Sequence, residues 1–170
     1  ELLAFSLCDD GAWMVELPVI QVVLGKNGST QEKIEGDNKT PIGTFKIGEA
    51  YGKEPKPDYI SLTYNQVTSE DKFIDDPEHA DYNSWVKGET TAKSYERMLR
   101  EDDVYDFGIV VEYNMNPVIA GKGSAIFLHV WREKDKGTEG CVAMTRGDVK
   151  RLLKWLKPKN NPHICILQPS

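Results

Sequence analysis

The feature that most restricts the fold is a succession of short apolar or alternating segments, separated by clusters of Gly, Pro, Asn and Asp. Residues 25–28 and 35–41 have the composition of such turns. The segments with strand character are residues 12–15, 19–24, 43–48, 59–64, 107–113, 125–130 and 163–167. Apolar runs of this length with this punctuation are typical of β-strands. The sequence therefore predicts a mainly β fold.

One amphipathic helix is predicted near the C-terminus. Thr145 and Asp148 resemble a capping box in which Asp takes the usual place of Glu. The apolar residues that then recur at helical spacing are Val149, Leu152, Leu153 and Leu156. Because Pro158 cannot continue a helix, we expect the helix to end before it, with Trp155 in the core.

Residues 75–103 differ from the rest of the chain. They begin with Asp-Asp-Pro, are polar and contain Tyr and Trp, and residues 95–100 have a helix-forming composition. We expect this segment to be an insertion that leaves the sheet and forms a cap or wall. Residues 1–170 as a whole are predicted to form a single domain, because 170 residues suffice for one core without disulfides or metals.

Composition excludes several classes of protein. The net charge of −6 argues against a general nucleic-acid binder, which needs a basic face. No apolar run approaches the roughly 18 residues that span a bilayer. The first residue is Glu1 rather than Met, and we expect a processed or trimmed form, from which a signal peptide or anchor could have been removed.

The cysteines and histidines do not have the spacing of a metal site or a disulfide framework. The residues concerned are Cys8, Cys141, Cys165, His79, His129 and His163. An odd number of widely spaced cysteines is not a framework, although one pair could form a bridge in an oxidising compartment. We therefore expect no bound metal.

The strongest chemical feature is His129 at the end of an apolar run, followed twelve positions later by Cys141. A cysteine nucleophile needs a base and hydrogen-bond donors for the developing oxyanion. His129 would supply the base, and Gly140 lets the backbone N–H groups approach a carbonyl oxygen. Spacing alone leaves two other interpretations open: a buried cysteine that acts as a small hydrophobe, and a histidine that is merely hydrogen-bonded at a strand end.

Several motifs, taken in order, resemble the L,D-transpeptidase (YkuD) family. Thr-Glu-Gly-Cys at 138–141, with His129 upstream, is similar to the family's His followed by Ser/Thr-x-Gly-Cys. Gly-Asp-Asn-Lys-Thr-Pro-Ile-Gly at 36–43 resembles its Gly-Asp-x-x-Thr-Pro-x-Gly stretch, and Gly-Lys-Asn-Gly at 25–28 resembles another landmark. The resemblance covers about residues 19–167 and implies a mixed β-sheet catalytic fold, sandwich- or barrel-like, with a few helices.

This chain departs from the family pattern at two positions. Glu139 stands where many members have a second His, and Ala143 stands where many have an Arg. Substrate contacts that the Arg makes elsewhere must then come from another residue. Arg132 and Arg146 are the candidates by proximity in sequence.

The resemblance implies acyl transfer on peptidoglycan stem peptides. Cys141 would attack the L,D bond before the D-Ala at stem position four, and His129 would take the thiol proton and return it to the departing amine. An amine from a second stem then gives a 3→3 cross-link. The carbonyl of Val130 would orient the imidazole. The nearby acids would then be only a solvated loop face; they are Glu133, Asp135 and Glu139.

The remaining candidates for substrate contact are Thr138, Glu139, Ser124, Tyr82, Asn83, Trp131 and Arg132. For Tyr82 and Asn83, a loop that is pinned by its own side chains is an equally good interpretation. The resemblance implies no cofactor, carbapenem-type β-lactams as inhibitors, no nucleic-acid partner and a monomer. It also implies a bacterial protein outside the cytoplasmic membrane, in the periplasm or cell wall.

Two alternatives stay open. The same Cys/His pair would serve an L,D-carboxypeptidase, or an enzyme that cleaves a bond between a stem and an attached protein. A non-catalytic cell-wall-binding module would keep the fold without the chemistry, and the retention of both His129 and Cys141 argues against it.

Overall fold

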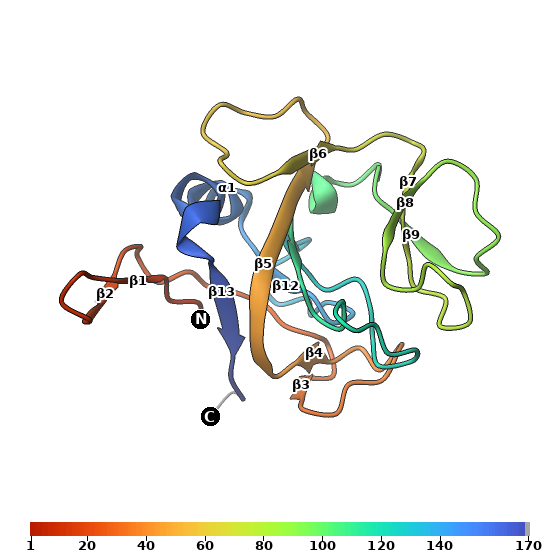
Figure 1. The fold of residues 1–170 in the computed structure, drawn as a ribbon, viewed down its shortest axis with the longest axis horizontal. Helices are drawn as coiled ribbons and strands as arrows, with labels where there is room; N and C mark the ends of the chain where they lie inside the picture. Colours follow the sequence, from red (N-terminus) through yellow and green to blue (C-terminus); the bar gives the residue numbers. More distant parts are fainter. Residues whose placement is uncertain (169–170) are drawn as a thin grey trace.

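A mixed six-stranded sheet forms the centre of the computed structural model, which describes residues 1–168 (Figure 1). Its strand order is β12-β11-β10-β5-β13, with β6 also paired to β5. The strands are β5 (Gly43–Gly52), β6 (Tyr64–Gln66), β10 (Phe107–Val111), β11 (Phe127–Val130), β12 (Val142–Met144) and β13 (His163–Ile166). β11 and β12 are parallel, as are β5 and β6, and the other pairs are antiparallel. The prediction of a mainly β fold is confirmed.

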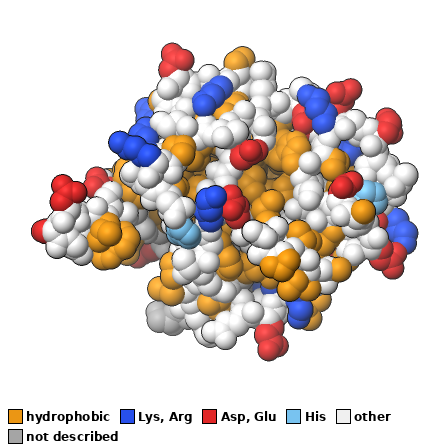
Figure 2. Space-filling model, viewed as in Figure 1, with side chains coloured by type: hydrophobic (Ala, Val, Ile, Leu, Met, Phe, Trp, Pro, Cys, Tyr) orange, Lys and Arg blue, Asp and Glu red, His pale blue; other side chains and the backbone are white. Residues whose placement is uncertain are grey.

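Three smaller sheets surround the central one. β1 (Phe5–Leu7) and β2 (Trp13–Val15) form a hairpin that projects from one side of the molecule and exposes hydrophobic side chains (Figures 1 and 2). β3 (Ser29–Thr30) and β4 (Thr40–Pro41) form a short parallel pair. On the side opposite the hairpin, β7 (Asp71–Ile74) lies between β8 (Trp85–Lys87) and β9 (Tyr95–Arg97) (Figure 1). Of its strands, β8 and β9 belong to residues 75–103, the segment that we expected to leave the main sheet.

The helix predicted from residues 95–100 is wrong, because β9 takes its place. Tyr95 and Glu96 pair with Ile74 and Phe73 of β7. Helix propensity is a weak preference of a few tenths of a kcal/mol per residue, and tertiary pairing overrides it.

The strands predicted at residues 19–24 and 59–64 are also wrong for most of their length. The first contributes only isolated bridges at Ile20 and Val23, and β6 begins at the last residue of the second. Ile60 and Leu62 are each 3% exposed without belonging to a strand. Apolar alternation at these positions reflects burial of one side of the chain rather than pairing with a neighbour.

Helix α1 (Arg146–Trp155) packs against the central sheet and completes the larger core cluster. Thr145 caps it as predicted, since its side chain accepts a hydrogen bond from the Asp148 N–H at 3.1 Å. The helix ends at Trp155, which is partly buried against this cluster. Two short 3₁₀ helices, η1 (Asp103–Tyr105) and η2 (Pro158–Asn160), complete the elements.

A second, aromatic cluster joins the central sheet to the β7–β9 sheet. Tyr51 of β5, Phe73 of β7, Tyr105 of η1 and Phe127 of β11 meet there, with ring centroids 5.1–5.8 Å apart in edge-to-face pairs. Cys141 belongs to this cluster. The candidate nucleophile therefore lies where two sheets are held together by aromatic packing.

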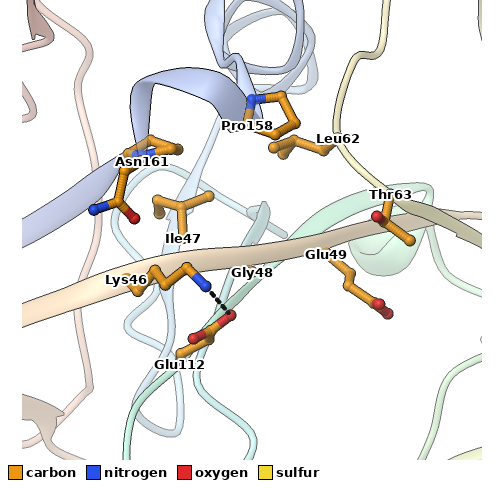
Figure 3. A pocket seen from close by; sticks show the side chains of 10 residues that line it. Lys46, Ile47, Gly48, Glu49, Leu62, Thr63, Glu112, Pro158 and Asn161 are labelled. Carbon is orange, nitrogen blue, oxygen red and sulfur yellow. Dashed lines mark ion pairs between the residues drawn. The ribbon is translucent and has the colours of Figure 1, made fainter.

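The hollow in Figure 3 is a separate feature of the surface. Lys46 and Glu112 form an ion pair at 3.7 Å beside it. Its other lining residues are Ile47, Gly48, Glu49, Leu62, Thr63, Pro158, Asn161 and Pro162. Neither Cys141 nor His129 lines it.

Residues 1–168 contain neither a membrane-spanning helix nor a cluster of metal ligands. No helix there has the length and apolar character needed to cross a bilayer. Within the same residues, no three His, Cys, Asp or Glu side chains are grouped so as to hold a metal ion. Cys8, Cys141 and Cys165 are all free thiols, and none forms a disulfide in the described structure.

Candidate active site

Cys141 and His129 are brought together by the parallel pairing of β11 and β12. Leu128 pairs with Val142 and His129 with Ala143, so Cys141, just before β12, lies level with Phe127. Side chains two residues apart on a strand share a face, which places His129 on the same face as Phe127. Tyr105 contacts the rings of both, at centroid distances of 5.8 Å for Phe127 and 5.5 Å for His129.

The thiol of Cys141 is buried and hydrogen-bonded to backbone. The residue is 8% exposed; its Sγ–H donates to the Ala125 carbonyl at 3.3 Å, and Sγ accepts from the Phe127 N–H at 3.3 Å. Burial raises the pKa of Cys141 to about 12, and the negative charges of Glu96 and Glu139 also raise it. The thiol is therefore protonated at neutral pH and needs a base before it can act as a nucleophile.

His129 is the candidate for that base. Its Nδ1 lies 2.8 Å from the Val130 carbonyl oxygen, the contact expected from the sequence. A carbonyl only accepts, so the proton lies on Nδ1 and the lone pair on Nε2. Burial lowers the pKa of His129 to about 4. At neutral pH the imidazole is thus neutral and can take a proton from a thiol.

The loop before Cys141 is shaped by Thr138 and Gly140. Gly140 has φ +144°, a backbone conformation that side-chain-bearing residues rarely adopt. Its N–H donates to Thr138 Oγ1 at 3.1 Å, and Thr138 Oγ1 donates to the Cys141 carbonyl at 2.7 Å. Thr40 of β4 lies 3.4 Å from the same carbonyl. Within residues 1–168 the Cys141 N–H makes no hydrogen bond, whereas the N–H of Gly140 is occupied by Thr138.

Asn83 supports the backbone against which the thiol lies. Its amide Nδ2 donates to the carbonyls of Tyr113 and Asn114 at 2.9 and 2.8 Å, and its Oδ1 accepts from the Ala125 N–H at 3.1 Å. Ala125 in turn accepts the Cys141 thiol proton. Because these bonds occupy both amide donors and the carbonyl oxygen, Asn83 fixes the site rather than presenting a free polar group to a substrate.

Ser124 and Tyr82 are joined by Glu35, a residue that the sequence analysis did not single out. Ser124 Oγ donates to Glu35 Oε2 at 2.7 Å, and the Tyr82 hydroxyl donates to the same oxygen. Tyr82 is 3% exposed and Ser124 6%. Ser124 and Tyr82, two of the predicted substrate-contact residues, therefore form a buried hydrogen-bond network with Glu35.

The other predicted contact residues are exposed or half-buried. Glu139 is exposed and pairs with Lys26 at 3.8 Å. Trp131 follows β11 and is half-buried, and Arg132 is exposed and pairs with Asp102 at 3.2 Å. Arg146, the other candidate for the missing Arg, pairs with Asp106 at 3.0 Å. Contact with a substrate stays a prediction for all of these residues and for Thr138.

Tyr105, Glu96 and Arg100 were missed by the sequence analysis. The Tyr105 hydroxyl donates to Glu96 Oε2 at 2.9 Å, and burial raises the pKa of Glu96. The Arg100 guanidinium binds both oxygens of Asp102, at 2.8 and 2.9 Å. The sequence pointed to them only through the segment 75–103, which we expected to form a cap or wall and which contains Glu96 and Arg100.

The depressed pKa of His129 predicts a specific loss of stability in acid. The pKa of a histidine in the unfolded chain is 6.5, whereas that of His129 in the native protein is about 4. Between these two pH values the unfolded chain binds a proton that the native protein does not bind. The free energy of unfolding therefore falls as the pH falls through this range. Once the pH is below both pKa values, the free energy of unfolding has fallen by about 3 kcal/mol. Urea unfolding at pH 7 and pH 4.5 should show a smaller acid loss in His129→Gln than in the wild type.

His163→Gln is the matched control for this measurement, because His163 is exposed and its Nδ1 also contacts a backbone carbonyl, that of Asn161. It should lose as much stability as the wild type. An equal loss in all three proteins would mean that His129 is not buried in its neutral form.

Comparison with known proteins identifies the family of this chain. The family model of the L,D-transpeptidase catalytic domain (YkuD) matches residues 4–164, nearly the whole chain. Neither the comparison with curated proteins nor that with solved structures gave a match.

Proposed function

Because the chain belongs to the L,D-transpeptidase (YkuD) catalytic-domain family, we propose that it catalyses cysteine-dependent acyl transfer on peptidoglycan stem peptides. Members of this family act on such peptides. The observation that carries the proposal is the pair formed by Cys141, a protonated thiol, and His129, a neutral imidazole oriented by its neighbour's carbonyl.

In the first step the thiol proton of Cys141 passes to Nε2 of His129 as sulfur bonds to the carbonyl carbon of the diamino acid at stem position three. The carbonyl oxygen becomes an oxyanion next to the Cys141 N–H. When the tetrahedral intermediate collapses, the bond to the D-Ala nitrogen breaks and His129 returns the proton to the departing amine. A thioester to Cys141 and free D-Ala are the products.

The thioester then reacts with a second nucleophile. An amine from another stem attacks the thioester carbonyl carbon and loses its proton to His129. The C–S bond to Cys141 then breaks, the proton passes from His129 to the sulfur, and the new amide is the 3→3 cross-link that we favour. Water in the same position gives a tripeptide, and the protein is then an L,D-carboxypeptidase. The absence of a second imidazole at Glu139 and of an Arg at position 143 keeps this second outcome open.

The test is incubation of the protein with purified disaccharide-tetrapeptides, followed by mass spectrometry. Dimers and free D-Ala are expected with the wild type and neither with Cys141→Ala. Cys165→Ala is the matched control, because Cys165 is exposed on β13, and it should retain full activity. Tripeptide monomers without dimers would establish the hydrolase instead, and no Cys141-dependent product would contradict both.

We also propose a location, an oligomeric state and a class of inhibitor. The protein acts outside the cytoplasmic membrane of a bacterium, where the stem peptides are, and functions there as a monomer. Carbapenems, which inhibit the family generally, acylate Cys141 because their strained carbonyl resembles the reacting carbonyl of the stem.

A further inference from the structure

Lys33 is a lysine in an unusual environment. It is 4% exposed, although lysines are seldom fully buried unless they are paired. Its Nζ donates to Asp37 Oδ1 at 2.7 Å. Asp37 also accepts from the N–H groups of Ile34 and Lys39, at 2.9 Å each, and so belongs to the turn that carries it. Within the described residues no second acceptor binds the Lys33 ammonium, which leaves N–H donors unused.

Two glycines make room for this side chain beside the nucleophile. A Cβ on Gly123 would lie 2.7–2.9 Å from the methylene carbons of Lys33, so the lysine stem passes directly over Gly123. A Cβ on Gly140 would lie 3.4 Å from the Lys33 ammonium. The carboxylate of Asp37 is not among the three atoms nearest to that point. The positive end of the ion pair therefore faces the residue that precedes Cys141.

The other charged and titratable groups near Cys141 do not favour an anion there. Glu96 and Glu139 are acids whose charges raise the pKa of Cys141, whereas the charge of Lys33 lowers it. Tyr51 and Tyr105 are neutral, because burial raises their pKa well above the ordinary value. His129 is neutral until it takes the thiol proton.

We propose that Lys33 is a positioning residue that stabilises the negative charge that forms at Cys141 when its proton passes to His129. This role rests on the proposed function only in taking Cys141 as the nucleophile. Lys33 acts through Cys141. The positive charge of Lys33 offsets part of the free energy needed to form a buried thiolate near Glu96 and Glu139. Asp37 holds the Lys33 side chain in place, and its negative charge partly cancels that of Lys33.

The test uses the thiol itself and needs no peptidoglycan. The intact protein is alkylated with iodoacetamide, a neutral reagent, at pH 7.5, and the modification of each cysteine is followed by peptide mass spectrometry. Exposed Cys165 gives an internal reference in every protein. Lys33→Met should slow the alkylation of Cys141 about tenfold, because removing a nearby opposite charge shifts a pKa by about one unit or more. Asp37→Asn should accelerate it, because the field of Lys33 is then uncompensated.

The opposite signs separate electrostatics from packing. A variant that merely loosened the turn at residues 33–39 would expose Cys141 and accelerate alkylation in both cases. Unchanged rates, or changes of the same sign in both variants, would overturn the proposal. If Lys33→Met fails to fold by circular dichroism, Lys33→Gln takes its place, and an alkylation rate equal to or above that of the wild type contradicts the proposal. Lys46→Met removes an exposed lysine and should change nothing.

Failure of this inference and failure of the proposed function are distinguishable. If disaccharide-tetrapeptides are not turned over but the alkylation rates change as expected, the proposed function fails and Lys33 keeps its role. If turnover depends on Cys141 but the alkylation rates do not respond to either variant, the proposed function stands without Lys33.

Discussion

His129→Gln is expected to lower the rate of D-Ala release by about 10²–10⁴-fold, the range typical of lost general acid–base catalysis. Glutamine fills a similar volume and retains a polar group, but it cannot take the thiol proton. Since burial raises the pKa of Cys141 to about 12, a negligible fraction of the thiol ionises at neutral pH without a base. The measurement is the initial rate of D-Ala release from disaccharide-tetrapeptide at pH 7.

The dependence of this defect on pH identifies its cause. In His129→Gln the thiolate can form only by loss of its proton to solvent, so the rate should rise about tenfold per pH unit between pH 7 and 9. The rate of the wild type should rise less over the same range, so the ratio of the two rates should become smaller as the pH rises. A defect that stays constant across this range would mean that His129 serves only to pack against Tyr105. His163→Gln, at an exposed histidine of β13, should retain wild-type activity at each pH.

Local patterns predicted those parts of the fold that depend on local interactions. The cap at Thr145 and the apolar face of α1 are set by contacts within a few residues, and both were found as expected. β9 was missed because Tyr95–Arg97 has no strand signal of its own and becomes a strand only through pairing with β7. The pattern at residues 59–64 was misread because it records burial, which a strand and an irregular segment produce equally.

In the candidate site, too, the sequence predicts the residues of a local motif but not the surroundings that distant segments supply. The two side chains on β11 and before β12 could be proposed from the motif, because the chemistry requires those residue types. Their environment could not be, since it is built by segments far apart in the sequence: Tyr105 against His129, and Asn83 against Ala125. The burial of Lys33 depends on Gly123, 90 positions away. A lysine near an aspartate is an ordinary surface pattern until the fold covers it.

Gly108→Ala tests the packing that joins the site to the sheet. Gly108 lies in β10, where it pairs with Tyr51 of β5 on one side and with His129 of β11 on the other. A Cβ at this position would lie 2.2 Å from Tyr51 Cζ and 2.3 Å from its hydroxyl oxygen. Tyr51 is fully buried, and the rings of Trp85, Tyr105 and Phe127 surround it at 5.5–5.6 Å. A shift of the Tyr51 ring would therefore disturb its packing against these three rings.

We therefore expect Gly108→Ala to lower the free energy of unfolding by about 3 kcal/mol or more, at the upper end of the cost of overpacking a core. Gly147→Ala is the matched control, because it adds the same methyl group in α1, where the nearest atom would be 3.7 Å away. It should raise stability by about 0.4–1 kcal/mol. Urea unfolding at pH 7 measures both. Similar stabilities for the two variants would show that β5 and β10 separate easily, and the aromatic cluster would then not hold His129 and Cys141 in register.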